Sequence, residues 1–489
     1  LRQLLGEAQR AGTATALRLA RLTRAAVDEL ARAIAPTNSL GERLFAETEG
    51  VPFFIVEYLA AIAESEGRDA EGALPSGVRN LLRARLRAVS QTATQVLNTA
   101  AVIGHSFDFD SVREASGRSE DETVAALEEL IARGLIAEIK TASGGESPTY
   151  DFSHEKLRAL AYAETSQARR RLIHRRVADA LVARPPRRTL AARASLVAQH
   201  YQLAGADAQA AEYFKLAGEH ARGLYANAEA LSHFRNALAL GHAETGALHE
   251  AIGDLQTLRG DYGAALTSYE TAATLCASDA LGSVEHKIGS VHLRQGAWGA
   301  AESHFESALA TLLSDGARAR LYADWSFAAR QRGAMERARE LARQSLALAE
   351  AADDRRALAE AHNILGVIAR SRDDADDARE HLQQSLRLAE MLDDASARMT
   401  ALNNLALVYG DHGERAAAMR FTEQALQLCV ALGDRHREAA LRNNLADLLH
   451  ADGQTEAAMA HLKQAVAIFA EIGGSDQPAQ PEIWKLTEW

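Results

Sequence analysis

The stretch NNLALVYGDHGERAAAMRFTEQALQLCVALGDRHREAALRNNLADLLHADGQTEAA (residues 403–458) contains one pattern twice, 40 residues apart. Each copy has a small residue in a first helix, a turn residue seven positions later and an alanine five positions after the turn. In the second copy these are Ala446, Gly453 and Ala458. A small residue lets two helix backbones approach closely, and glycine supplies the backbone angles of a tight turn. The pattern predicts a pair of helices joined by a short turn.

Four further copies precede this stretch, and successive turn positions lie 36, 37, 40, 40 and 40 residues apart. A single helical hairpin cannot bury its apolar face alone, so neighbouring hairpins stack into a solenoid. We therefore expect six hairpins. Their small, turn and alanine positions are Gly253, Gly260 and Ala265; Gly289, Gly296 and Ala301; Ser326, Gly333 and Ala338; Gly366, Asp373 and Ala378; Ala406, Gly413 and Ala418; and Ala446, Gly453 and Ala458.

This pattern resembles the tetratricopeptide repeat (TPR), whose usual length is about 34 residues. Asp354, Asp394 and Asp434 recur between successive hairpins, and Gly474 continues the series. We expect each to end a long second helix, which accounts for the 40-residue spacing. All eight prolines lie outside residues 187–477, as expected of a continuous helical array.

Length and composition narrow the class of protein. A chain of 489 residues exceeds one hydrophobic core, and its net charge of -12 argues against a protein built to coat nucleic acid. The two cysteines, Cys276 and Cys429, form no disulfide or metal-ligand pattern, which favours a cytoplasmic setting. No apolar run has the roughly 20 residues that span a bilayer, so no membrane partner is expected. We predict no metal site.

Upstream of the array, residues 200–238 indicate further helices, either degenerate repeats or a coupling bundle. Nearer the N-terminus, three helices are followed by two strands, an order typical of a winged helix with its β-wing. The sequence favours no other strand except residues 17–22. The predicted helices span residues 76–89, 93–103 and 120–133, and the strands span 135–141 and 149–152, joined by a turn at Gly144 and Gly145.

Six motifs in residues 41–181 resemble the bacterial signal-transduction ATPases with numerous domains (STAND), which include MalT-like and LuxR-type large regulators and ATPase-coupled adenylate-cyclase-like proteins. In that family a nucleotide lies between a P-loop domain, a helical lid and a winged helix, and a helical array serves as sensor. The motifs are GERLFAETEGVPFFIVEYL, LPSGVRNLLRARL, AAVIGHSF, LEELIARGLI, YDFSHEKLRALAY and RRRLIHRRVADAL.

The resemblance assigns nucleotide contacts to three residues. Gly50 and Pro52 match the lid's glycine-any-proline motif, whose proline packs on adenine, and His154 matches a histidine that reaches the nucleotide phosphate. Each also has a structural interpretation. Pro52 suits the first position of a helix, and His154 suits a capping or core position after a strand.

The chain departs from the family because it contains no GxxxxGK[ST] motif to cradle phosphates. We therefore expect no enzymatic activity and no cofactor in this chain, with ATP or ADP and magnesium bound in a longer parent protein. The absence of an initiator methionine suggests a fragment that begins after the P-loop domain, which would then be a partner in cis.

Paired asparagines recur on the first helices of the last hairpins, at Asn363, Asn403, Asn404, Asn443 and Asn444. In the resembled repeat proteins this helix lines a concave groove. A side-chain amide both donates and accepts, so it can bind a peptide backbone. The alternative is a structural ladder that joins adjacent hairpins.

These inferences predict an all-α fold in which a right-handed TPR superhelix follows a lid remnant and a winged-helix domain. The expected segments are a lid remnant (1–72), a winged helix (73–165), linking helices (166–245), the array (246–475) and a tail (476–489).

We expect a sensor half of a nucleotide-switched signalling protein, most simply a transcriptional regulator. Its groove would bind a peptide, a protein or a small-molecule inducer, and the chain could form a homo-oligomer. DNA contact would come only through a missing effector domain. The alternatives are a fragment of a cyclase-like or kinase-like enzyme, or a passive TPR scaffold.

Overall fold

The computed structural model describes residues 21–34, 40–52, 54–56, 58–59, 76–139, 147–183, 190–312 and 314–472. The chain forms two compact units. The first comprises Leu1–Arg187 and Gln199–Ala206, and the second comprises Arg188–Ala198 and Asp207–Trp489. Among the described helices, none combines the length and apolar character needed to cross a bilayer.

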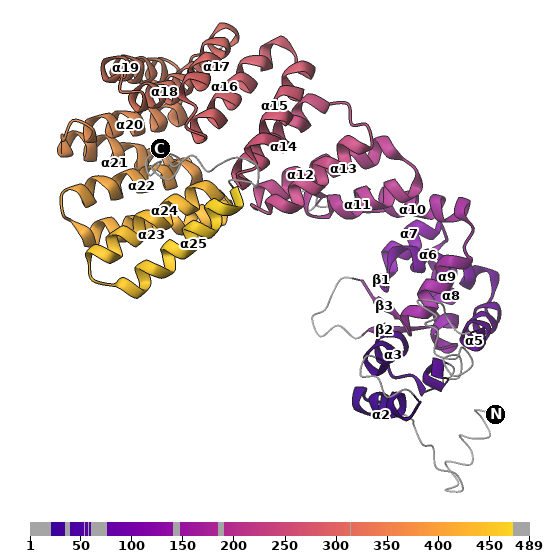
Figure 1. Cartoon of the computed structure of the whole chain (residues 1–489). Coiled ribbons are helices and arrows are strands. Elements are labelled where there is room, and N and C mark those ends of the chain that lie inside the picture. Colours follow the sequence, from indigo (N-terminus) through magenta and orange to yellow (C-terminus); the bar gives the residue numbers. More distant parts are fainter. Residues whose placement is uncertain are drawn as a thin grey trace. The chain divides into compact units, whose positions relative to one another are not determined.

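The second unit is an array of helical hairpins that follow one another along a curved path (Figure 1). The predicted TPR superhelix is confirmed. The hairpins pair α12 (Asp207–Gly223) with α13 (Asn227–Ala239), α14 (Thr245–Arg259) with α15 (Tyr262–Leu275), α16 (Ser278–Arg294) with α17 (Trp298–Thr311), α18 (Asp315–Gln331) with α19 (Met335–Ala351), α20 (Arg355–Arg370) with α21 (Ala375–Met391), α22 (Ala395–Asp411) with α23 (Arg415–Leu432), and α24 (Arg435–Ala451) with α25 (Thr455–Ile472).

The turn and alanine positions of the predicted register are confirmed. All six turn residues adopt left-handed backbone angles, including Asp373 at φ 59°. Such angles are uncommon for residues other than glycine, so the five glycines and this aspartate mark the ends of first helices. The alanines five positions later are buried, with side-chain exposure of 0% at Ala265 and 7% at Ala458.

The small first-helix residue also leaves room for a large side chain of the second helix. At Gly289 a Cβ would lie 2.5 Å from Cε1 of Phe305, and at Gly253 it would lie 2.6 Å from Cε1 of Tyr269. The nearest neighbour at these two positions is therefore the large side chain sixteen positions later on the second helix, and at Gly366 the backbone oxygen of Ala378 is also within 3.2 Å of a built Cβ. In these two hairpins, the absence of a side chain on the glycine makes room for the large ring.

A seventh hairpin, α12 with α13, follows the same register. A Cβ on Gly218 would lie 2.5 Å from Cε1 of Phe234. Tyr225, seven positions after Gly218, has φ 59°, and Ala230 is fully buried. Of the two interpretations of residues 200–238, the structure supports repeats. The sequence concealed this copy because a tyrosine occupies the turn position.

The recurring aspartates begin helices. Asp354 accepts hydrogen bonds from the backbone N–H groups of Arg356 and Ala357, and Asp394 accepts one from that of Ala397. Asp434 caps α24 in the same way through Arg437. Each is therefore an N-cap of the next first helix. Gly474 lies outside the described residues. Second helices of 14 residues, as in α15, accompany the shorter spacings, and helices of 17 or 18 residues accompany the 40-residue spacing.

The first unit contains helices and a three-stranded antiparallel sheet of order β1-β3-β2 (Figure 1). Its core includes Phe107, Leu130, Phe152 and Leu157. The elements are α2 (Arg24–Ile34), α3 (Leu40–Thr48), α5 (Ser76–Arg87), α6 (Gln91–Ile103), β1 (Ser106–Asp108), α7 (Phe109–Ser116), α8 (Glu120–Ala132), β2 (Ile136–Ile139), β3 (Thr149–Phe152), α9 (Glu155–Glu164) and α10 (Gln167–Ala183); α11 (Leu190–Ala204) contributes its last residues.

The expectation of only two strands here was wrong, because β1 pairs with β3, with Phe107 opposite Tyr150. Three residues are too few for an alternating pattern to be visible in the sequence. The predicted turn at Gly144 and Gly145 lies outside the described residues. So does most of the strand expected at residues 17–22, and its described part, 21–22, is not a strand.

Candidate ligand-binding site

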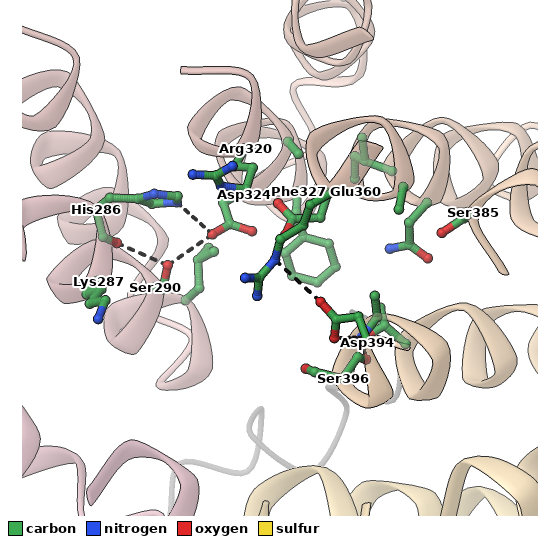
Figure 2. Close-up of a pocket in the computed structure, with 18 of the residues that line it drawn as sticks. His286, Lys287, Ser290, Arg320, Asp324, Phe327, Glu360, Ser385, Asp394 and Ser396 are labelled. Atoms are coloured by element: carbon green, nitrogen blue, oxygen red, sulfur yellow. Dashed lines mark hydrogen bonds and ion pairs between the residues drawn. The ribbon is translucent and has the colours of Figure 1, made fainter. Parts of the chain in front are cut away.

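A cavity of about 490 Å³ lies on the inner side of the array (Figure 2). Most of its lining comes from side chains of the first helices α16, α18, α20, α22 and α24. Its size is within the range of about 300–1,000 Å³ that is common for small-molecule sites.

One wall of the cavity is acidic. Asp324 accepts hydrogen bonds from Ser290 Oγ at 2.9 Å and pairs with His286 Nε2 at 2.9 Å. Burial raises the pKa of Asp324, but the contacts with His286 and Ser290 outweigh burial and hold that pKa below its usual range. Asp324 therefore remains ionised at neutral pH.

Glu360 completes this wall, near Asp324 and the ring of Phe327 (Figure 2). Burial and the charge of Asp324 raise the pKa of Glu360 to about 8. Arg356 Nε lies 3.7 Å from Glu360 Oε1 and 3.4 Å from Asp394 Oδ2, so one guanidinium contacts both acidic side chains. This part of the cavity holds more acidic than basic groups.

Basic side chains line other parts of the cavity, and carboxylates contact them. Arg320 Nη1 donates to Asp354 Oδ2 at 2.9 Å. Arg294 makes two hydrogen bonds of 2.9 Å to the two oxygens of Asp434. Charged groups of both signs around a central aromatic ring suit a polar ligand that carries charge of its own.

The asparagines form the ladder that was the structural alternative. Asn404 Nδ2 donates to Asn363 Oδ1 at 2.9 Å, and Asn444 Nδ2 donates to Asn403 Oδ1 at 3.2 Å. Asn403 and Asn404 have exposures of 0% and 1%, so a partner would reach them only after the hairpins moved apart. Asn363 lines the cavity, and Asn443 is half-buried. Partner binding by the five asparagines stays a prediction.

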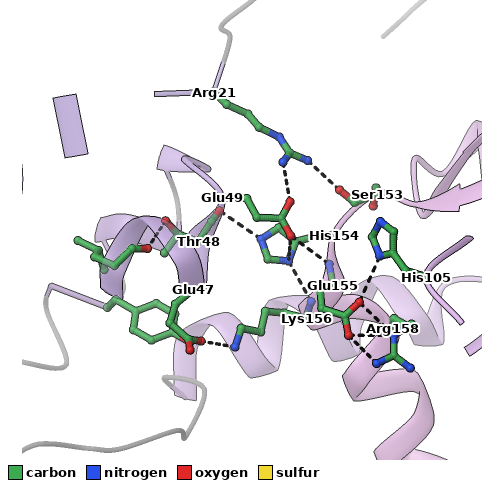
Figure 3. Close-up of polar contacts among 12 residues, drawn as sticks. Arg21, Glu47, Thr48, Glu49, His105, Ser153, His154, Glu155, Lys156 and Arg158 are labelled. Atoms are coloured by element: carbon green, nitrogen blue, oxygen red, sulfur yellow. Dashed lines mark hydrogen bonds and ion pairs between the residues drawn. The ribbon is translucent and has the colours of Figure 1, made fainter. Parts of the chain in front are cut away.

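His154 lies in the first unit, between α3 and α9 (Figure 3). Its Nδ1 accepts from the backbone N–H of Lys156 and caps α9, while its Nε2 lies 3.2 Å from the carbonyl oxygen of Thr48. Burial lowers the pKa of His154, so the ring is neutral at pH 7 and Nε2–H donates to Thr48. The same carbonyl oxygen also accepts the backbone N–H of Val51 at 3.0 Å, so His154 adds a second hydrogen bond at the end of α3.

Charged contacts join the same two segments (Figure 3). Arg21 donates to Glu49 Oε2 at 2.6 Å and to the carbonyl oxygen of Ser153 at 2.9 Å. Lys156 forms an ion pair with Glu47. The segment that contains α3 is therefore fixed to the segment that contains β3 and α9.

Gly50 has a structural role that requires no nucleotide. Its φ is 75°, and a Cβ there would lie 2.3 Å from the carbonyl oxygen of Leu22. Pro52 is exposed and helical, in keeping with its structural interpretation. Nucleotide contacts by Gly50, Pro52 and His154 remain predictions.

The charged residues of the cavity were not predicted from the sequence. A signal was present, because Arg320 and Asp324 are four residues apart on one first helix and Arg356 and Glu360 are four apart on the next. Residues so spaced share a helix face. The described residues contain no group of histidine, cysteine and carboxylate side chains arranged to hold a metal ion.

Comparisons with known proteins agree with the repeat architecture. The tetratricopeptide repeat family model matches residues 397–471. No protein of curated function matches the sequence.

Solved structures with a similar course include a STAND protein with a TPR sensor, PH0952 from Pyrococcus horikoshii, at 13% identity and a TM-score of 0.48, covering 96% of this chain and 68% of that one. Another is the Rap conjugation gene regulator of the plasmid pLS20 in complex with the Phr* peptide, at 12% identity and a TM-score of 0.46, covering 78% and 95%. Function does not follow from likeness at this level.

Proposed function

We propose that this chain is the ligand-sensing and regulatory half of a nucleotide-switched signalling protein, and that a ligand in the cavity of the array is its input. The observation that carries the proposal is the cavity itself. It has the size of a ligand site, and its lining contains the ionised carboxylate of Asp324 beside Glu360, whose raised pKa keeps a proton available at neutral pH.

The first unit supports the switching part of the proposal. Its helices α5, α6 and α8 and its strands β2 and β3 fall on the segments expected for a winged helix, with β1 and α7 inserted between α6 and α8, and this order supports the proposal. His154, Arg21 and Lys156 join the α3 segment to that module through a small set of polar contacts. Polar contacts of this kind can exchange between two arrangements when a ligand favours one of them.

In the longer parent protein, a P-loop domain in cis would bind the nucleotide, with Gly50, Pro52 and His154 beside it. A transcriptional effector domain would produce the output. This chain itself would carry out no catalysis.

The ligand input can be tested by filling the cavity. Ser283 and Ser396 both line it and are exposed, so Ser283→Trp and Ser396→Trp add bulk to the cavity without displacing the core. The full chain is incubated with cell extract, and bound molecules are identified by native mass spectrometry. We expect the wild type to retain a ligand and each tryptophan variant to retain at least about tenfold less.

Ala347→Trp is the matched control, because Ala347 is an exposed residue of the second helix α19 and does not line the cavity. It should bind as the wild type does. Equal recovery from all four proteins, or none from the wild type, would contradict a ligand input at this cavity.

A further inference from the structure

The two ends of the array meet. Asn227 Nδ2 of α13 donates to the carbonyl oxygen of Leu432 at 2.7 Å, and Tyr262 of α15 forms a hydrogen bond with Nδ1 of His436. Arg294 of α16 binds Asp434 through two parallel hydrogen bonds. Sequence separations of 205, 174 and 140 residues show that these contacts join the first hairpins to the last. We call the three contacts the clasp.

The central pair of the clasp is buried, since the side chain of Asp434 is 2% exposed and that of Arg294 is 21% exposed. Burial raises the pKa of Asp434, but Arg294 and Arg437 outweigh it and keep the carboxylate ionised. Parallel two-point contact makes this a strong pair, and either charge would be costly to leave alone. The pair therefore holds the two ends of the array together. If the ends separate, Arg294 and Asp434 must both become exposed to water.

The clasp also forms part of the cavity wall. Arg294 and His436 line the cavity, as Asp324 and Glu360 do. Asp434 in addition caps α24 through the backbone N–H of Arg437, so it fixes the start of the helix that carries His436. If the ends separated, the cavity would lose one wall, because α24 would leave α16.

Resting on the proposed function, we propose that the array is a gated chamber for a compact, drug-sized ligand, and that the clasp between Arg294 and Asp434 is its gate. A cavity of about 490 Å³ admits a small molecule and is too small for a folded domain. A ligand that touches both walls stabilises the closed turn, because it has contacts there that the open form lacks.

The gate is tested with charge reversals in the full chain: Arg294→Glu, Asp434→Arg and the two combined. The radius of gyration is measured by small-angle X-ray scattering, and helicity by circular dichroism. We expect each single reversal to enlarge the radius while most helicity remains, and the double reversal to restore the wild-type value. Arg294→Met, which removes the charge without reversing it, gives the same test if a reversal fails to fold.

Arg370→Glu is the matched control, because Arg370 pairs with Asp411 between the neighbouring helices α20 and α22 and not across the clasp. Its radius should equal that of the wild type. An unchanged radius in Arg294→Glu and Arg294→Met, or a double reversal that stays enlarged, would overturn the gate.

The ligand class is tested by dividing the extract into low-mass and high-mass fractions. The wild type should take its ligand from the low-mass fraction, and Arg294→Glu should lose at least about tenfold of it. A ligand found only in the high-mass fraction overturns the compact chamber but leaves the proposed function intact. A ligand found in neither fraction overturns the ligand-binding claims, while the scattering result still decides whether the clasp closes the turn.

Discussion

At the scale of single residues, backbone angles decide where each first helix ends. Asp373 stands at a turn position that glycine occupies in the other five predicted hairpins, yet it has the same left-handed conformation, with φ 59°. Aspartate tolerates this conformation better than most residues because its short side chain can hydrogen-bond locally. The turn geometry is therefore imposed by the hairpin, and glycine is only the least costly residue for it.

Replacing this aspartate by glycine should stabilise the protein. We expect Asp373→Gly to raise the free energy of unfolding by about 0.5–1 kcal/mol, because glycine adopts φ above zero without the steric cost of a Cβ. Urea unfolding followed by circular dichroism measures the change. Gly413→Ala, at the matching turn with φ 77°, should cost about 1 kcal/mol. A loss of stability in Asp373→Gly would show that its side chain matters more than its backbone.

At the scale of the helix pair, packing is an exchange of volume. The ring of Phe305 occupies the space that Gly289 leaves open, and the same relation joins Gly218 with Phe234 seventy residues earlier in the chain. Where the first-helix residue is Ser326, the position sixteen later is Ala342. The sequence pattern therefore records a local steric rule, which explains why it holds in hairpins of different length.

A methyl group at Gly289 should disturb this packing. We expect Gly289→Ala to lower the free energy of unfolding by about 1–3 kcal/mol, because the new Cβ would overlap the ring of Phe305. Thermal unfolding measures the loss. Gly299→Ala is the control: this glycine has no neighbour within 4 Å of a built Cβ, so the change should be neutral or stabilise α17 by about 0.5 kcal/mol. Equal effects at the two sites would contradict the exchange of volume.

At the scale of the whole molecule, both units bury neutral histidines. His174 and His200 share a hydrogen bond of 2.9 Å between their Nδ1 atoms in the first unit, and His436 lies in the clasp of the second. Burial lowers the pKa of each to about 4, helped for His200 by the charge of His174 and for His436 by that of Arg294. Because these histidines are neutral in the folded protein, its stability depends on pH.

Stability should therefore fall on acidification. Below pH 6.5 these histidines bind protons in the unfolded chain, whereas in the folded chain they stay neutral down to about pH 4. Each histidine therefore lowers the free energy of unfolding by up to about 1.4 kcal/mol per pH unit between these two values. Glu360 acts in the opposite direction because its pKa is raised, but its half-exposed side chain weakens that effect. Calorimetry should show a melting temperature that drops from pH 7 to pH 5.

His200→Gln removes one titrating group and should make this drop shallower in the first unit. A melting temperature that is constant or rises over the same interval would contradict the assignment of neutral buried histidines.

The sequence by itself determined the repeat register: where first helices turn, which alanines are buried and where Asp354, Asp394 and Asp434 separate the hairpins. These features depend on contacts within about 40 residues, and local sterics repeat wherever the same residue types recur. Only the tertiary structure decided that Arg294 meets Asp434, that Asp324 faces Glu360 and that the asparagines bind one another. Those contacts depend on the curvature of the array, to which every hairpin adds a small rotation, and no single stretch of sequence encodes the total.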